Sequence, residues 1–308
     1  MMRALSSGIS GLKAHQTAMD VVGNNIANVD TSGFKSSNTI FRDALYQTIE
    51  SASASGYTST SDTGAAGVNP SQIGYGANAS SININTTAGD FSSTGSNMDC
   101  AIDGEGYFVI ADGSPDSTTP TQPTSYKYTR LGTFSFDSEG YLTDGTGNRV
   151  CGQNNTSTTS GTLGATTTLS PTDYSSDKPQ YIHYDVSDTA KNDLKDIAVS
   201  SDGTVTATND GVAVTIGKVA LARFQNAAGL TQDGSSFYKV SSNSGDATYA
   251  APGSSGTGSL KTGGLESSNV DLATEFANMI TYERGFQANS KIMTVADEML
   301  ETLVNMKR

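Results

Sequence analysis

Apolar residues recur at helical spacing only near the two ends of the chain. Over residues 3–29 they fall alternately four and three positions apart, which is a narrow heptad row rather than a broad apolar face. This row consists of Leu5, Ile9, Leu12, Gln16, Met19, Gly23 and Ile26. A second row over 270–307 consists of Leu272, Phe276, Met279, Phe286, Ile292, Ala296, Met299, Leu303 and Met306. The pattern predicts one long helix at each end.

Polar residues mark where these helices begin and end. Ser268-Asn269 and Val270-Asp271 offer an N-cap and a negative charge at the start of the second helix. Lys307-Arg308 places positive charge at its end, where the helix dipole favours it. The amide-rich stretch 24–28 is expected to end the first helix and to begin an extended arm that runs through Gly33.

Between the helices the pattern changes to short alternating runs separated by turn signals. Runs of this kind occupy 81–85, 106–110 and 133–136. Dipeptides such as Asp103-Gly104 and Asp144-Gly145 separate runs of this type and favour tight turns. The middle of the chain is therefore predicted to be β structure of the sandwich or open-barrel kind.

The fold class that follows is mainly β with terminal α-helices, in which a discontinuous β domain accompanies paired, coiled-coil-like helices from both ends. Two low-complexity polar stretches help to set the boundaries, because they lack an apolar period. The predicted parts are a terminal helical domain (1–30 and 268–308), an extended connector (31–69), a β domain (70–152 and 192–267) and a short, exposed insert or small outer domain (153–191).

Charge narrows the classes of partner. The 308 residues include 18 Lys and Arg against 31 Asp and Glu, which gives a net charge of −13. This argues against nucleic acid, whose binding needs a basic surface, and against anionic lipid. The sequence has no run of 18 apolar residues, so we expect no membrane insertion, and its first residues are too polar for a cleaved secretory signal.

Candidate chemistry is sparse. His15 and His183 are the two histidines, and neither has a second His or Cys at metal-ligand spacing. The stretch 137–144 has Tyr141 and Leu142 where a calcium loop needs an oxygen ligand and a glycine, so a hairpin is the preferred interpretation. Cys100 and Cys151 are too few for a disulfide framework, and the sequence does not show whether they pair. We expect no enzyme activity, metal or cofactor.

Several longer segments resemble one family. Residues 1–12 and 23–36, with Gly23-Asn24-Asn25-Ile26-Ala27-Asn28, are similar to the N-terminal signature of the bacterial flagellar rod and hook proteins. The segments 72–76, 101–108, 128–134, 264–272 and 287–291 resemble the same family in the same order. The resemblance covers nearly all of the chain except about 153–195.

Three features favour the hook subunit within that family, namely the first residues, the His15-Gln16 pair and the stretch 297–308. Hook subunits polymerise into a curved tube that transmits torque from the rod to the filament. The distal rod subunit is the alternative, since hook proteins carry a larger outer domain than the insert here. The resemblance implies that copies of the chain form a helical polymer. It also implies contacts with the distal rod protein, the hook cap protein, the hook–filament junction protein and the flagellar export apparatus. The expected location is extracellular, in the hook and basal body of the flagellum.

Two other classes of function are weighed against this one. A secreted adhesin or glycan-binding module would fit the Ser-, Thr- and Gly-rich β region, but it has no use for heptad rows at both ends. An enzyme would need a nucleophile–base pair or a metal constellation, which the sequence does not offer.

The heptad rows are the predicted site of subunit assembly. Narrow rows fit other helices, within the chain or in neighbouring copies, better than they fit a β domain, although packing on the β domain is the alternative. The residues expected to be fully buried only in the polymer are Leu5, Ile9, Leu12, Met19, Ile26, Phe276, Met279, Phe286, Ile292, Met299, Leu303 and Met306.

Overall fold

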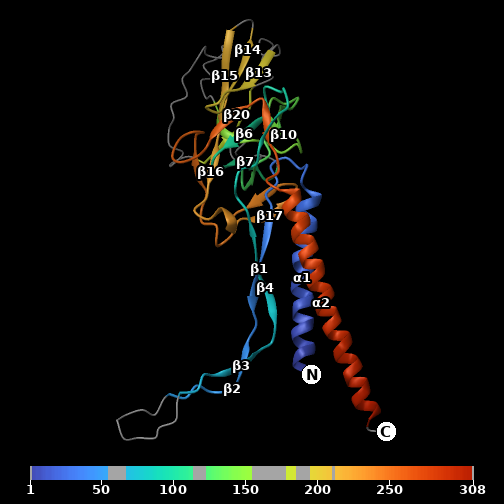
Figure 1. The fold of residues 1–308 in the computed structure, drawn as a ribbon. Coiled ribbons are helices and arrows are strands. Elements are labelled where there is room, and N and C mark those ends of the chain that lie inside the picture. Colours follow the sequence, from blue (N-terminus) through green and yellow to red (C-terminus); the bar gives the residue numbers. More distant parts are fainter. Residues whose placement is uncertain are drawn as a thin grey trace. The chain divides into compact units, whose positions relative to one another are not determined.

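The computed structural model describes residues 2–54, 67–113, 123–154, 178–184, 195–209 and 212–306. They form two compact units (Figure 1). The helical unit comprises 1–27, 37–85 and 271–308, and the β unit comprises 28–36 and 86–270.

Two long helices dominate the helical unit. Helix α1 spans Met2–Ala27 and helix α2 spans Leu272–Asn305, and they run side by side in opposite directions (Figure 1). Asp271 caps α2, because its Oδ1 accepts a hydrogen bond from the Ala273 N–H at 3.0 Å and its Oδ2 accepts one from the Thr274 hydroxyl at 2.6 Å.

A two-stranded antiparallel ribbon completes the helical unit. Strand β1 (Ser37–Asp43) pairs with β4 (Ala77–Ile84), and β2 (Tyr46–Glu50) pairs with β3 (Ser71–Gly74). A further bridge joins Ser53 to Val68. Contacts tie the ribbon to α1, where the Ser10 hydroxyl lies 3.3 Å from the Tyr75 carbonyl.

The β unit contains two larger antiparallel sheets. The six-stranded sheet has the order β17 (Thr231–Gly234), β18 (Phe237–Lys239), β8 (Tyr126–Thr129), β7 (Tyr107–Ala111), β16 (Leu221–Arg223), β19 (Thr248–Ala250). The five-stranded sheet has the order β12 (Gln180–Tyr181), β11 (Cys151–Asn154), β15 (Val212–Val219), β14 (Thr204–Asn209), β13 (Lys195–Val199).

Three strand pairs and one short 3-10 helix, η1 (Ala227–Gly229), complete this unit. The pairs are β5 (Phe91–Ser93) with β21 (Gly264–Glu266), β6 (Cys100–Asp103) with β20 (Ser259–Thr262), and β9 (Phe134–Phe136) with β10 (Leu142–Asp144).

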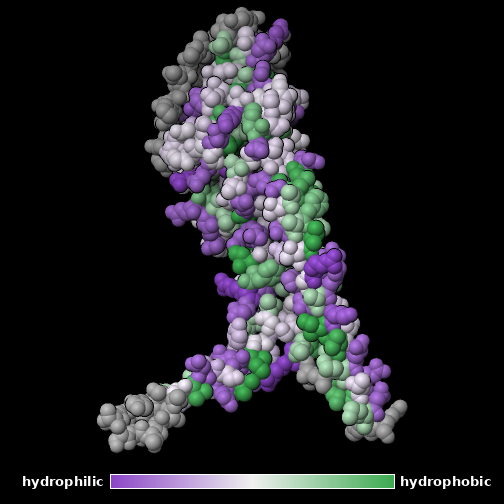
Figure 2. Space-filling model, viewed as in Figure 1, coloured by the Kyte–Doolittle hydropathy of each residue, from purple (hydrophilic) through white to green (hydrophobic). Residues whose placement is uncertain are grey.

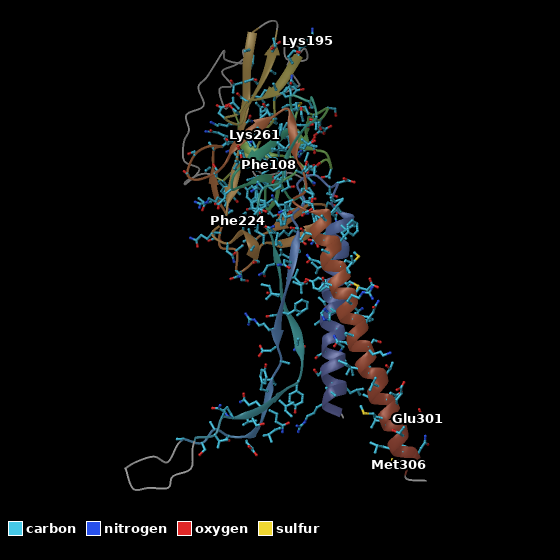
Figure 3. The ribbon with its side chains drawn as sticks, viewed as in Figure 1. Phe108, Lys195, Phe224, Lys261, Glu301 and Met306 are labelled. Atoms are coloured by element: carbon cyan, nitrogen blue, oxygen red, sulfur yellow. The ribbon has the colours of Figure 1, made fainter. Side chains whose placement is uncertain are left out.

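The hydrophobic core of the molecule lies in the β unit. Phe108, labelled in Figure 3, is fully buried, and its ring meets that of Phe134 edge-on at 5.0 Å. Residues from both larger sheets join this cluster, including Ile110, Val205 and Leu221. One core therefore serves segments that lie on both sides of the predicted insert.

The predicted fold class, mainly β with a helix at each end, is confirmed. The helices predicted over 3–29 and 270–307 are α1 and α2, and the predicted strands at 106–110 and 133–136 coincide with β7 and β9 to within one residue. The strand predicted at 81–85 is the second half of β4, which begins four residues earlier.

The structure differs from the sequence interpretation after the first helix. Residues 28–33 form consecutive turns instead of an extended arm, and the hydrogen bond from the Phe34 N–H to the Thr31 carbonyl closes one of them at 3.2 Å. Residues 37–54 are not a plain connector, because β1 and β2 pair with β4 and β3 to build the ribbon. Residues 70–85 consequently group with the helices and not with the β unit.

Part of the predicted insert also differs from the expectation. Within 178–184, Tyr181 and Ile182 are buried, and Ile182 belongs to the core cluster, so this part is not exposed. Pairing of β12 with β11 explains the burial, since it inserts this short strand at the edge of the five-stranded sheet. The remaining insert residues, 155–177 and 185–191, lie outside the described residues, as does 55–66 of the predicted connector.

Candidate assembly surfaces

The two helices meet through small residues. On α1 the residues that contact α2 include Gly8, Gly11, His15 and Asn25. Ala18 and Val22 continue the same heptad spacing and are buried, and we call these six residues the inner row. A Cβ atom placed on Gly8 would lie 3.5 Å from the Met293 Cγ, and one placed on Gly11 would lie 2.6 Å from the Asn289 Nδ2. Glycine at these positions therefore allows the close approach of α2.

An aromatic cluster continues the inner row. A Cβ atom on Gly285 of α2 would lie 2.6 Å from the His15 Nε2, so the imidazole fills the space above this glycine. The His15 ring lies 5.8 Å from the Phe41 ring and 6.1 Å from the Tyr282 ring. His15, which the sequence offered only as a structural histidine, thus packs α1 against both α2 and β1.

Asn25 joins the same three elements at the other end of α1. Its side-chain amide donates to the Ser37 carbonyl at 2.8 Å and to the Glu275 Oε1 at 3.1 Å, and its Oδ1 accepts from the Ser37 N–H at 3.0 Å. Buried amides need such partners, and here they fix the turn that ends α1. The function of the amide-rich stretch is therefore to join elements as well as to end the helix.

The predicted assembly row lies beside the inner row, and its member Ile292 approaches Gly8 of α1. Leu5, Leu12, Met19 and Ile26 are half-buried, and Ile9 is exposed. On α2, Met279 is half-buried, and the exposed members are Phe276, Phe286, Ile292, Met299, Leu303 and Met306. Figure 2 shows hydrophobic residues along α2 towards its C-terminal end. The chain alone therefore leaves most of the predicted row accessible to solvent.

The last two turns of α2 extend past α1. The pairs Gly8–Ile292, Gly11–Asn289 and His15–Gly285 set a register in which Met2 lies opposite the turn that precedes Met299. Residues 299–306, which include Glu301 and Met306 labelled in Figure 3, continue beyond the first described residue of α1, and we call them the overhang. Its apolar side chains are exposed, with 49% for Leu303 and 83% for Met306.

A second group of exposed apolar residues lies on the ribbon. Leu45 is 83% exposed, and Tyr46, Ile49, Val68 and Ile73 are exposed as well. Two-stranded hairpins are at best marginally stable in water, so accessible apolar faces on such a ribbon indicate a partner. Leu45, Tyr46, Ile49 and Val68 were not predicted because 31–69 was assigned to a connector, and Ile73 was assigned to the β domain. The β-branched and aromatic residues Tyr46, Thr48 and Ile49 were the available signal.

A buried ionic node joins the two end segments of the β unit, 28–36 and 264–270, which we call the arms. The Lys35 ammonium lies 2.6 Å from the Glu266 Oε1 and donates to the Thr87 carbonyl at 2.7 Å. The Arg130 guanidinium lies 3.3 Å from the Glu266 Oε2 and donates to the Gly104 carbonyl at 2.9 Å. Lys35 is fully buried, and desolvation lowers its pKa despite the opposing attraction of Glu266.

Hydrogen bonds around the node hold the two arms to each other. The Gly33 N–H donates to the Glu266 carbonyl at 2.8 Å, and the Ser36 N–H donates to the Asn269 Oδ1 at 2.7 Å. Gly33 has φ of +70°, and a Cβ atom there would lie 3.0 Å from the Arg130 backbone. The node and its surroundings thus use residues from four of the segments that carry the family resemblance.

Within the described ranges, no group of His, Cys, Asp and Glu could hold a metal ion. Cys100 and Cys151 are buried free thiols, and burial raises the pKa of both. None of the described helices is long and apolar enough to cross a membrane.

The chain therefore combines a pair of long helices from its two ends, accessible apolar rows on these helices, and a β unit. Three family models match the chain, and they are described as flagella basal body rod protein (residues 5–35), flagellar hook protein FlgE/F/G D1 domain (101–207) and flagellar basal body rod FlgEFG protein C-terminal (261–306).

Full-length relatives agree with these models. The flagellar basal-body rod protein FlgG of Bacillus subtilis (strain 168) is 42% identical over 310 residues, which cover all of both chains. The protein of the same name from Caulobacter vibrioides is 34% identical over 304 residues, 97% of each chain. The flagellar hook protein FlgE of Borreliella burgdorferi is 26% identical over 457 residues, which cover all of both chains. The chain belongs to the flagellar rod and hook protein family.

Proposed function

We propose that this protein is a structural subunit of the distal rod of the bacterial flagellum, and that its copies polymerise into a straight tube. The observation that carries this proposal is the length of the alignments. The rod relative aligns over 310 positions with a chain of 308, whereas the hook relative requires 457. Long gaps in this chain must accommodate the extra positions, so the hook relative has insertions that this chain lacks.

The hook function predicted from the sequence is replaced by its alternative. The features that favoured the hook were short ones, namely the first residues, the His15-Gln16 pair and the last helical turns. His15 packs between α1, α2 and β1 within the chain, so it carries no information on the kind of tube. The short insert already argued for the rod.

Assembly follows from the apolar rows that the helix pair leaves accessible. A row on one copy that contacts a different surface on the next makes a heterologous contact, and such contacts that do not close produce a helical polymer. Burial of a Leu, Ile, Phe or Met side chain contributes about 1.5–3 kcal/mol, so a few residues of each row suffice to drive association. We propose that Leu5, Ile9, Leu12, Met19 and Ile26 and the exposed row of α2 form these contacts.

The partners follow from a place in the rod. They are further copies of this chain and the rod and hook components at either end of its segment, reached through the flagellar export apparatus. The hook cap and hook–filament junction proteins belong to the hook interpretation and are not part of this proposal. The location is the flagellar basal body outside the cytoplasm.

Electron microscopy of purified basal bodies from a strain that lacks this gene tests the proposal. We expect basal bodies whose rods stop short of their full length and carry no hook. Basal bodies with rods of full length and no hook would contradict the distal rod assignment and would restore the hook interpretation.

A further inference from the structure

The β unit has a pocket of about 870 Å³ whose walls come from six parts of the chain. These are 86–88, the turn 104–106 with Tyr107 of β7, Arg130 directly after β8, 223–228 from the end of β16 into η1, Thr248 of β19, and Ser255. Phe224, labelled in Figure 3, and Tyr107 contribute aromatic surface. Two arginines, Arg130 and Arg223, line the same space.

The first observation is an excess of buried positive charge at the wall of this pocket. The ionic node holds two cations, Lys35 and Arg130, but only one carboxylate, Glu266. The exposed fractions of the side chains are 0% for Lys35, 4% for Arg130 and 3% for Glu266, so water does not screen the excess positive charge. In the part of the chain that the structure describes, no other carboxylate pairs with either cation. Buried charges are normally paired, because an unpaired one carries a large desolvation cost.

The second observation is an unused hydrogen-bond donor on the same arginine. Arg130 directs its terminal nitrogens to Glu266, to the Ile102 carbonyl and to the Gly104 carbonyl. Its Nε is buried and, among the described residues, has no acceptor. A guanidinium has five donors, and buried donors without a partner are rare. Arg130 therefore brings a positive charge to the wall of the pocket, and its buried Nε reaches a ligand only after the side chain moves.

Arg223 supplies a second cation at a more accessible position. It is 48% exposed at the side chain, and its Nε donates to the Glu105 Oε2 at 3.0 Å. Glu105 also lines the pocket and is 73% exposed, so it is free to turn towards solvent when another anion arrives. Glu105 thus competes with any anion for Arg223.

We propose that this pocket binds a carboxylate between Arg130 and Arg223. The planar fork of a guanidinium matches a carboxylate, and charge-assisted hydrogen bonds of this kind are the strong ones. The carboxylate comes either from a free small molecule or from an acidic side chain of a second copy of this chain, which carries a net charge of −13. Binding itself does not depend on the distal rod assignment, and only the second source does.

Titration of the purified full-length monomer with citrate, at constant ionic strength set by sodium chloride, tests the proposal. We expect saturable binding by calorimetry and a shift of the Arg130 Nε–H resonance in nitrogen-15 spectra. Arg223→Gln should weaken citrate binding about tenfold, the scale of one charge-assisted hydrogen bond. Glu105→Gln should strengthen it, because the competing carboxylate is gone.

Lys239→Gln is the matched control. Lys239 is 42% exposed and pairs with Asp233 at 2.9 Å, much as Arg223 pairs with Glu105, but it does not line the pocket. It should leave citrate affinity unchanged. Absence of saturable binding, or equal affinity in the wild type and Arg223→Gln, would overturn the proposal.

Assembly experiments then separate the two sources. If a second copy provides the carboxylate, citrate inhibits polymerisation and Arg223→Gln raises the protein concentration needed for it. If the ligand is a free small molecule, polymers bind citrate as tightly as the monomer does, and Arg223→Gln assembles like the wild type. Because the monomer titration needs no polymer, its failure is distinct from failure of the proposed rod function.

Discussion

At the scale of single residues, polar groups hold the two arms to each other within the β unit. The Glu266 carboxylate forms ion pairs with Lys35 and Arg130 and accepts a hydrogen bond from the Gly89 N–H. Removing one partner of a buried ion pair costs more than the pair contributes, because the remaining charge stays buried without compensation. The node is therefore a sensitive point of the β unit.

Glu266→Gln should lower the free energy of unfolding by about 3–5 kcal/mol, since Lys35 and Arg130 would remain buried without an anion. Urea denaturation of the purified monomer, followed by tyrosine fluorescence, measures the change. Glu105→Gln removes a partner from an exposed pair and should change stability by less than about 1 kcal/mol. Equal effects of the two substitutions would show that the node is not the stabilising feature described above.

The node also marks a limit of sequence analysis. Lys35 and Glu266 are 231 positions apart, and no local pattern links them. The family resemblance included both residues without indicating a contact between them. Sequence patterns did predict the features that depend only on neighbouring residues. The Asp271 cap and the hairpin of β9 and β10 follow from short-range hydrogen bonding and glycine conformation, and both were predictable.

At the scale of elements, one row of residues on α1 packs against α2, and the adjacent row carries the larger apolar residues that we propose for assembly. The inner row is built from glycine, alanine and a few special side chains, which bring α1 and α2 close together. The large apolar residues lie on the neighbouring row and remain accessible. Heptad spacing predicted both helices correctly, but it selected the row of larger residues. The size and hydrophobicity of a residue do not show whether its side chain packs within its own chain or against another copy.

Glycines of α1 should respond to substitution according to their place. Gly11→Leu should weaken the helix pair, because even a Cβ atom there would lie 2.6 Å from the Asn289 side chain. Gly23→Ala has open space around it and should stabilise α1 by about 0.5–1 kcal/mol through the lower backbone entropy of alanine in the unfolded chain. Thermal unfolding followed by circular dichroism at a helix wavelength measures both, and a stabilising Gly11→Leu would contradict the assigned contact.

At the scale of the whole molecule, the β unit buries its apolar side chains within the chain, whereas the end of α2 leaves its apolar side chains exposed. The core residues gather in the β unit, whereas α2 ends in an overhang with accessible Met299, Leu303 and Met306. The overhang continues a long helix, so a partner is needed to bury its apolar side chains rather than to form its helical turns. Assembly and folding should accordingly respond to different substitutions.

Leu303→Asp and Ile292→Asp should abolish polymerisation, because each would bury an unpaired carboxylate in the contact between copies. Both residues are exposed in the single chain, so melting of the β unit should hardly change. Asn305→Asp adds the same charge to the overhang at a polar position and should still assemble. Sedimentation of polymers and calorimetric melting of monomers provide the two readouts. Assembly by either of the first two variants would remove these residues from the proposed surface.

Electron cryomicroscopy of tubes assembled from the purified protein tests the central claim most directly. We expect straight tubes in which α1 and α2 of successive copies line the inner wall, with Leu303 and Met306 buried between copies and the β units outside. Tubes in which the β units line the inner wall and the overhang stays in solvent would contradict the account.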